Sequence, residues 1–521
     1  MKKGRYFDRW LGNGDVRQQL WLLITIVLLG AGLRFFQLDR ESLWVDEIAT
    51  AKLIREESFT VLWQKILHEE ISPPLYFVTL WGWSRLWGLS EWGMRSFSAV
   101  MGSIALILFL HLARLLLPPP WQWKAVLLFA LSPMLVAASQ EARMYALLLV
   151  LWLWGMIALW QGLEGNEQSV QWSVIPLTLA LYTHPYGGFL LLLWISAVGL
   201  YARRRKRWRL LRPAVIAGLL FLPWLFHWYE WMLDGRLAQK HWIAPLSWKA
   251  PVGLALLFAG WVPPFPKNFA VAVQGITLVW SIAVALSAGI LWGAVAVSVG
   301  RVWTGRDRSI ALLHLWLWLP LVVVALLSLT WMPLWVHRYF IGLYPAALLL
   351  AVAGLDRLSE RTSRWLFTAL NLALVILLLR LFTEPHKEQW REAVRMIEEQ
   401  AQPGDAVLFQ PGFLSDAYQY YARRTDLQVY RFPVIPRKLQ KSDADTVQML
   451  ARQYDRLWYV FSPLHQYDPA EVILQTLRET HAVRSHYRFY GVEVLLHVRQ
   501  GSEHRKECQL QPGRKDRRTS L

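Results

Sequence analysis

The chain has 521 residues, of which 55% are apolar and only 18% are charged, and its mean hydropathy is +0.27. Soluble domains carry roughly 25% charged residues, so this composition excludes a disordered chain, a coiled coil and an ordinary soluble enzyme. We attribute the formal net charge of +18 to basic residues that set the orientation in the membrane rather than to a nucleic-acid-binding surface. No nucleic-acid partner is expected. The single cysteine, Cys508, excludes an intramolecular disulfide framework.

Apolar runs predict eleven membrane-spanning helices, because a hydrocarbon core of roughly 30 Å requires about 20 apolar residues per helix. The runs lie at 20–36, 96–117, 124–140, 145–162, 170–183, 186–201, 213–231, 269–299, 309–330, 338–355 and 365–382. Two other apolar stretches are not counted. Residues 73–89 begin with two prolines and contain Arg85, so we expect a helix in the outer interface, and 250–262 is too short to cross.

Charge sets the predicted orientation of these spans. Residues 202–212 hold seven Lys/Arg and no acid, and the positive-inside rule places them in the cytoplasm together with the basic amino terminus, 1–19. An even number of spans must then separate the two segments, which holds when 73–89 does not cross. The carboxyl-terminal part of the chain therefore lies outside.

A change of composition after Phe382 predicts a second domain over 384–499, following a transmembrane domain over 20–383. Its polar, mixed sequence contains helix-like and strand-like runs, typical of a small extracytoplasmic α/β domain. The helix-like runs are 387–401, 443–452 and 469–480, and the strand-like runs are 405–409, 456–461, 485–490 and 492–498. The basic tail, 500–521, is expected to be disordered.

The first outer segment, 37–95, carries a candidate catalytic pair. Residues 37–72 hold eight Asp/Glu against four Lys/Arg and include Ser-Leu-Trp-Val-Asp46-Glu47. One carboxylate of such a pair can take a proton from an acceptor hydroxyl, while the other orients the acceptor or binds a divalent cation. The alternative is that both carboxylates simply begin an exposed helix, where the helix dipole favours them. We expect this segment to fold as amphipathic helices from about Trp44 onward.

Further polar side chains are predicted on the same outer face. They come from different loops: Arg95 after the interfacial stretch, Glu141 and Arg143 in Ser-Gln-Glu-Ala-Arg, His184 in Tyr-Thr-His-Pro-Tyr, and Arg338 in His-Arg-Tyr. A lone interfacial Arg or His is usually an anchor. Together, however, they form a set able to activate a hydroxyl and hold a phosphate. The sequence contains no nucleotide-binding or hydrolase motif. An activated substrate already in the membrane is therefore the simpler source of energy for a transfer reaction.

The order of these motifs resembles the GT-C superfamily of membrane glycosyltransferases. SLWVDE, SPPLYF, the stretch from Gly88 to Arg95, SQEARMYAL and YTHPYG carry the resemblance, which covers about 20–200 and extends more weakly to 355. The most similar branch contains the protein O-mannosyltransferases, the lipid A aminoarabinose transferases and the Rgt-type sugar transferases. The resemblance implies an α-helical polytopic GT-C fold of about eleven transmembrane helices and interfacial helices, followed by the α/β domain.

The resemblance also implies a reaction. A polyprenyl-phosphate-linked sugar would be transferred with inversion to a hydroxyl of a glycan, lipid or protein, on the extracytoplasmic face of the cell membrane. Asp46, Glu47 and Glu141 would be catalytic. Arg95, Arg143, His184 and Arg338 would bind the donor phosphate. A divalent cation at Asp46 and Glu141 is possible, although Ser72 stands where some relatives have His.

A transporter or flippase for lipid-linked sugars is the alternative class. It would need charged residues in mid-span, often with paired broken helices, whereas the predicted spans are mostly clean and their charges lie at the ends. A scaffold that only displays the outer domain would not explain carboxylates and arginines on one face.

Overall fold

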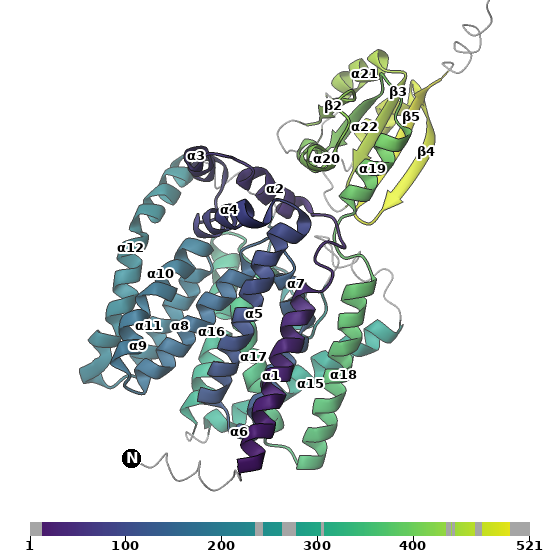
Figure 1. Cartoon of the computed structure of the whole chain (residues 1–521). Helices are drawn as coiled ribbons and strands as arrows, with labels where there is room; N and C mark the ends of the chain where they lie inside the picture. Colours follow the sequence, from purple (N-terminus) through teal and green to yellow (C-terminus); the bar gives the residue numbers. More distant parts are fainter. Residues whose placement is uncertain are drawn as a thin grey trace, which may run out of the picture. The chain divides into compact units, whose positions relative to one another are not determined.

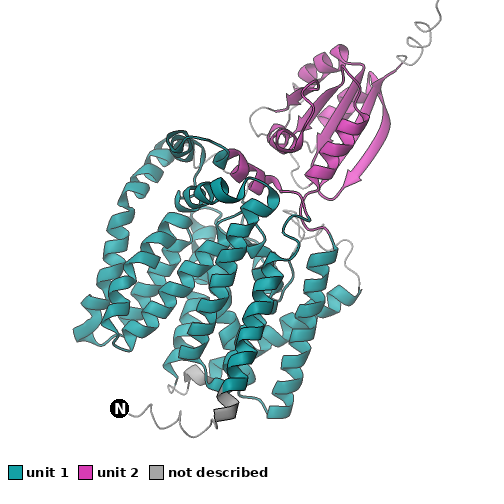
Figure 2. Ribbon diagram, in the orientation of Figure 1, with its two compact units in different colours: residues 1–40, 53–263, 275–384 teal, residues 41–52, 264–274, 385–521 magenta. Residues whose placement is uncertain are grey.

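The structure is a computed structural model that describes residues 13–234, 243–262, 278–303, 307–433, 439, 443–463 and 471–500. The chain forms two compact units, shown in teal and magenta in Figure 2: 1–40, 53–263 and 275–384 form unit 1, and 41–52, 264–274 and 385–521 form unit 2. Most of the basic tail and residues 1–12 lie outside the described residues, as does 269–277 of one predicted span.

Unit 1 is helical (Figure 1). Its elements are α1 (Asn13–Phe35), α3 (Phe59–Glu69), α4 (Leu75–Trp87), α5 (Glu91–Leu116), α6 (Pro119–Leu131), α7 (Pro133–Ser139), α8 (Tyr145–Leu163), α9 (Glu167–Trp172), α10 (Val174–Thr183), α11 (Gly187–Tyr201), η1 (Arg204–Lys206), α12 (Arg207–Leu233), α13 (Lys249–Phe258), α15 (Leu278–Trp303), α16 (Arg308–Thr330), η2 (His337–Leu343), α17 (Tyr344–Leu355) and α18 (Glu360–Thr383).

Within the described residues, eight helices are long and apolar enough to cross a membrane, or nine if the bent pair α6 and α7 is one span. The chain is a multi-pass membrane protein. The break in the pair, bent by 55°, falls at Ser132-Pro133, where proline lacks an N–H and Ser132 caps α7 by accepting from Leu135 N (3.4 Å).

Besides the predicted span 124–140, which is the bent pair, two of the eleven predicted spans are not single membrane-length helices. The predicted span 170–183 is divided at Ser173 into α9 and α10, and 186–201 is the 15-residue α11. These two crossings stay predictions. The stretch 250–262, predicted to be too short to cross, overlaps the 10-residue helix α13, and 73–89 contains the 13-residue α4. Figure 1 shows α3 and α4 at the end of the bundle where α1 finishes.

Close helix contact at the centre of unit 1 depends on glycine. Every residue of α17 is buried, so its neighbours approach on all sides. A Cβ at Gly354 would lie 1.8 Å from the carbonyl oxygen of Ala294 on α15. At Gly102 on α5, a Cβ would lie 2.0 Å from Ser139 Oγ. Both positions exclude any larger side chain because interiors are close-packed.

Unit 2 contains a five-stranded sheet of order β2-β1-β3-β5-β4. The central β1 (Ala406–Gln410) pairs in parallel with β2 (Gln428–Arg431) and β3 (Arg456–Phe461). β5 (Val492–Arg499) pairs antiparallel with β3 and with β4 (His481–Phe489). The other elements of this domain are α19 (Trp390–Gln400), η3 (Gly412–Leu414), α20 (Ser415–Tyr421), α21 (Ala444–Gln453) and α22 (Val472–Arg478). Sequence analysis predicted all of these strands except β2, a short edge strand.

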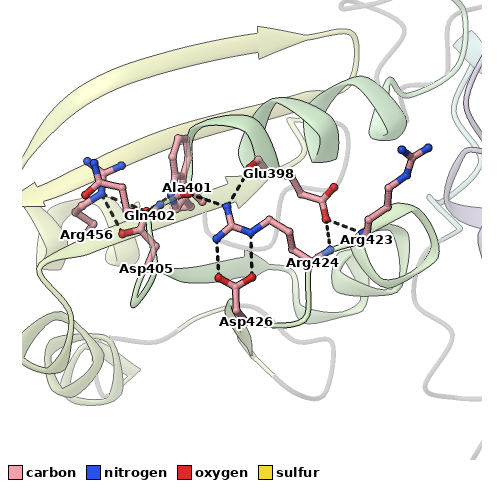
Figure 3. A network of polar contacts seen from close by, with 9 residues as sticks. Glu398, Ala401, Gln402, Asp405, Arg423, Arg424, Asp426 and Arg456 are labelled. Carbon is pink, nitrogen blue, oxygen red and sulfur yellow. Dashed lines mark hydrogen bonds and ion pairs between the residues drawn. The ribbon is translucent and has the colours of Figure 1, made fainter.

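Charged side chains tie the helix α19 to the start of the sheet (Figure 3). Arg424 donates to both carboxylate oxygens of Asp426 (2.6 and 2.9 Å) and to the backbone carbonyl of Glu398 (3.0 Å). Arg456 Nε, at the first residue of β3, donates to Asp405 (3.0 Å) just before β1. These contacts satisfy the buried Asp405 and support a structural assignment for the network.

One segment departs from the division made by sequence. Residues 41–52, which include α2 (Val45–Ile54) up to Lys52, belong to unit 2, although the chain on either side of them belongs to unit 1. Figure 2 shows this segment in the colour of the C-terminal domain. The predicted helical character of 37–72 is confirmed by α2 and α3, with Ile48 and Leu62 buried and Glu57 and Glu69 exposed.

Candidate active site

The end of α1 is held by a buried amide from the turn after α7. Gln140 Nε2 donates to the carbonyls of Leu33 (3.1 Å), in the last turn of α1, and of Phe36 (2.8 Å), just after it. The last carbonyls of a helix need partners from outside it. Arg34, fully buried in the last turn of α1, donates to Gly30 O (2.7 Å). This packing fixes the point at which the chain leaves α1 and places Glu141 directly after an anchored residue.

Arg95 lies in the first turns of α5, a helix whose N-cap residue is Ser90. Ser90 Oγ accepts from Gly93 N (3.1 Å), and Arg95 is 2% exposed. Arg95 Nη1 donates to Leu38 O at 2.8 Å. This residue therefore supports the connection that leads out of α1, and its predicted role as a phosphate ligand stays a prediction.

Glu141 and Arg143 lie in the turn between α7 and α8. The carboxylate of Glu141 is buried, and Arg143 is half-buried. Ser98 Oγ on α5 donates to the carbonyl of Arg143 (3.4 Å), which links the turn to α5. The two residues follow the bent pair α6 and α7 directly, so the break at Ser132-Pro133 sets the direction in which the turn leaves.

Two predicted phosphate ligands from separate segments of the chain, His184 and Arg338, lie beside two tyrosines. The His184 ring lies 4.5 Å from Tyr339 and 6.3 Å from Tyr145, centroid to centroid. The guanidinium carbon of Arg338 lies 5.9 Å from the Tyr145 ring and 5.8 Å from the Tyr339 ring. His184, Arg338 and Arg143 were predicted from the sequence, but the tyrosines were not. The only signal for the tyrosines was that each follows an arginine within two residues.

Burial and two arginine charges set the ionisation of His184. His184 is in the turn after α10, outside both flanking helices, and its Nδ1 accepts from Tyr186 N (3.1 Å). Burial, and then the positive charges of Arg143 and Arg338, lower the pKa of His184 to about 3. The imidazole is therefore neutral near pH 7, with Nε2 carrying the proton, and it can serve as a hydrogen-bond donor rather than as a cation.

Asp46 and Glu47 lie in the first turn of α2, in unit 2. Glu47 Oε2 accepts from the backbone N–H of Trp44 (3.3 Å), as the third helical residue does in a capping box. Glu47 is fully buried, and Nζ of Lys387 lies 3.3 Å from its Oε1. Asp46 is partly exposed. The two neighbouring carboxylates therefore have different surroundings.

The segment 41–47 is further bound by the residues that follow α18. Val45 N donates to Glu388 Oε2 (3.2 Å), and Ser42 Oγ donates to Glu388 O (2.7 Å). Glu41 Oε2 lies 2.8 Å from His386 Nδ1. Sequence analysis assigned no role to 386–388. The available signal was a run of charged residues immediately after the last span.

A divalent cation at Asp46 and Glu141 stays a prediction. The two residues belong to different units. Across the described ranges, no three His, Cys, Asp or Glu side chains form a group that could hold a metal ion.

No protein-family model matches this sequence, and no curated protein is detectably similar to it. Solved structures are similar in fold. ArnT from Cupriavidus metallidurans in the apo state aligns over 92% of this chain and 98% of its own, with 14% identity and a TM-score of 0.57. The same protein bound to undecaprenyl phosphate aligns over 93% and 98%, with 15% identity and a TM-score of 0.54.

An archaeal protein has the same architecture. The oligosaccharyltransferase AglB from Archaeoglobus fulgidus, in complex with an inhibitory peptide and a dolichol-phosphate, aligns over 93% of this chain and 74% of its own, with 12% identity and a TM-score of 0.54. The chain therefore has the fold of the GT-C membrane glycosyltransferases, and the fold class expected from the sequence motifs is confirmed.

Proposed function

We propose that this protein is a membrane glycosyltransferase that moves a sugar from a polyprenyl-phosphate-linked donor to an acceptor hydroxyl, with inversion, on the extracytoplasmic face of the cell membrane. The observation that carries the proposal is that His184 and Arg338, from separate segments of the chain, lie beside Tyr145 and Tyr339, with the charge of Arg143 also acting on His184. Two half-buried arginine charges and a neutral imidazole donor are suited to a phosphate group. The fold shared with ArnT bound to undecaprenyl phosphate supports a lipid-linked donor.

The reaction needs one base and one stabilised leaving group. Asp46 takes the proton from the acceptor hydroxyl as its oxygen forms a bond to the anomeric carbon. The bond from that carbon to the phosphate oxygen breaks, and polyprenyl phosphate leaves with the electron pair. The transition state is oxocarbenium-like, as in glycoside hydrolysis. Arg143 and Arg338 balance the phosphate charge, so no proton has to be given to the leaving group.

The remaining predicted residues support this arrangement. Glu141 lies two residues before Arg143 and is the proposed acceptor-side carboxylate. Arg95 is the proposed further contact to the donor phosphate. The donor carries a hexose or a pentose, and the acceptor hydroxyl belongs to a glycan, lipid or protein.

The experiment is sugar release by purified protein from a labelled polyprenyl-phosphate sugar, with candidate acceptors present. We expect labelled product and free polyprenyl phosphate. NMR of the product should show that the anomeric configuration is inverted relative to the donor. A flippase would move the donor from one leaflet of the vesicle membrane to the other without breaking the sugar–phosphate bond. That outcome would contradict the proposal.

Asp46→Asn tests the proposed base. The substitution keeps the shape and removes the proton acceptor, so turnover should fall about 10²–10⁴-fold, or roughly 3–5 kcal/mol of barrier. Asp39→Asn, at an exposed aspartate seven residues earlier, is the matched control and should retain activity. A folded Asp46→Asn protein within about threefold of wild type would refute the assignment.

A further inference from the structure

A buried ion pair joins the candidate catalytic turn to the C-terminal domain. Nζ of Lys387 lies 3.3 and 3.4 Å from the two carboxylate oxygens of Glu47, and the side chains are 2% and 0% exposed. A charge buried this deeply is tolerated only when it is paired, so neither residue can change independently of the other. Glu47 is the immediate neighbour of Asp46.

The next residue along the chain holds the same turn through its backbone. Glu388 Oε2 accepts from Val45 N (3.2 Å) and from Trp390 Nε1 (2.7 Å). Trp390 is fully buried and begins α19, so this carboxylate is fixed from the side of the domain. The first N–H groups of a helix have no partner within it, and a carboxylate there also complements the helix dipole.

The linker that carries Lys387 and Glu388 is itself part of the folded domain. Gln389 N donates to Tyr490 O (2.9 Å), and Tyr490 N donates to Gln389 Oε1 (2.8 Å). Tyr490 lies between β4 and β5. The position of the linker is therefore set by the sheet of unit 2, and α2 receives its contacts from a rigid element rather than from a free strand of chain.

We propose that Lys387 and Glu388 are positioning residues for the transfer reaction: from the C-terminal domain, they fix the first turn of α2 and thereby the direction of Asp46. The inference rests on the proposed function, because it takes Asp46 as the reacting group. It also separates the two carboxylates. Glu47 is committed to the ion pair and the capping box, and Asp46 alone exchanges a proton with the acceptor. The C-terminal domain thus acts on the proposed base through the first turn of α2, which belongs to the same unit.

The test compares two lysines that contact the same helix or the same domain. Lys387→Met removes the buried pair. Lys52→Met removes an exposed pair between α2 and Asp416 of the same domain (3.0 Å, Lys52 side chain 52% exposed) and is the matched control. Lys387→Arg keeps the charge. A small misplacement of a reacting group can cost about 10²-fold in rate, so Lys387→Met should lower kcat by about this factor.

The KM for the polyprenyl-phosphate sugar should change little in Lys387→Met, because the phosphate ligands are in unit 1. Lys387→Arg should recover most of the lost kcat, and Lys52→Met should remain close to wild type. Lys387→Met also removes a positive charge, and a nearby positive charge favours the ionised form of a carboxylate. The acidic limb of the plot of kcat against pH should therefore move to higher pH. Glu388→Ala removes the acceptor of Val45 N and Trp390 Nε1 and should also lower kcat, whereas Glu388→Gln keeps an acceptor and should stay closer to wild type.

The outcomes separate this proposal from the function itself. If wild type releases no sugar from any donor, the proposed function fails. If wild type is active, Asp46→Asn is inactive and Lys387→Met matches Lys52→Met in kcat and in pH profile, the function stands and the positioning role is overturned. If Lys387→Met loses its fold, Glu388→Ala decides: wild-type kcat in a folded Glu388→Ala protein, which lacks the acceptor of Val45 N, would overturn the proposal.

Discussion

The ring of His184 meets that of Tyr339 edge to face, with centroids 4.5 Å apart and planes at 67°. Together with the bond from Tyr186 N to Nδ1, this contact fixes the imidazole and its tautomer. The group is held as a neutral donor between two arginine charges.

His184 should therefore not titrate during catalysis. Its pKa in the folded protein, about 3, lies below the ordinary value of 6.5, so the ring stays neutral from pH 5 to 8. His184→Asn keeps an acceptor and a donor, and its pH profile should have the same shape as that of wild type. His184→Ala should lose more activity than His184→Asn. A limb near pH 6–7 present in wild type and absent from His184→Asn would contradict this.

Arg143→Ala and Arg338→Ala should weaken donor binding as well as turnover. The phosphate is charged in the ground state and in the transition state, so both KM and kcat/KM report the loss. Hydrogen bonds to charged groups contribute about 1.5–3 kcal/mol, which corresponds to roughly 10–100-fold in affinity. Titration with polyprenyl phosphate measures the binding. Arg364→Ala, at an arginine with 70% of its side chain exposed, is the control.

Low pH should loosen the attachment of α2 through Glu41. Burial raises the pKa of Glu41, but the charge and hydrogen bond of His386 and the charge of Lys387 outweigh it and lower the pKa below 4.5. The folded pKa is below the unfolded one, so the stabilisation is complete above about pH 4.5 and is lost as pH falls through the folded pKa. Hydrogen exchange of 45–54, normalised to 59–69, should rise below that pH in wild type and rise less in Glu41→Gln. Equal rises in both proteins would show that another group is responsible.

Gly354→Ala should destabilise unit 1. The new Cβ would lie 1.8 Å from the carbonyl oxygen of Ala294, so α15 and α17 would have to separate, at a cost of about 1–3 kcal/mol or more. Gly289→Ala, on α15 with nothing within 4 Å of its Cβ, should gain a few tenths to about 1 kcal/mol from helix propensity. Thermal unfolding in detergent compares the two. Equal melting temperatures would contradict the tight contact.

The orientation in the membrane is tested by cysteine labelling. In a Cys508→Ser background, a membrane-impermeant maleimide should label Ala482→Cys in the C-terminal domain and leave Lys206→Cys unlabelled until cells are permeabilised. Both positions are exposed, so access decides the result. Labelling of Lys206→Cys in intact cells would invert the topology and place the proposed site on the cytoplasmic face.

The sequence by itself determined the membrane class, most helices and the strands of the second domain. Apolar length and strand alternation are local properties, so α5, α8 and β3 could be predicted closely from the residues within them. The edge strand β2 was missed because its four residues, two exposed and two half-buried, do not show the alternation of apolar and polar residues that predicts a strand. The break of 170–183 at Ser173 was missed because Gln171 and Ser173 were counted within an otherwise mostly apolar run.

Only the tertiary structure decided which candidate residues come together. His184 and Arg338 are more than 150 positions apart, and nothing local requires their loops to meet at Tyr145 and Tyr339. The neutral state of His184 follows from that meeting, because burial and neighbouring charges set a pKa. In the same way, residues 41–52 were assigned by sequence to the membrane domain, but they pack with the C-terminal domain through Lys387 and Glu388. A buried ion pair between residues 340 positions apart is a property of the folded chain, since neither partner's own segment specifies the other.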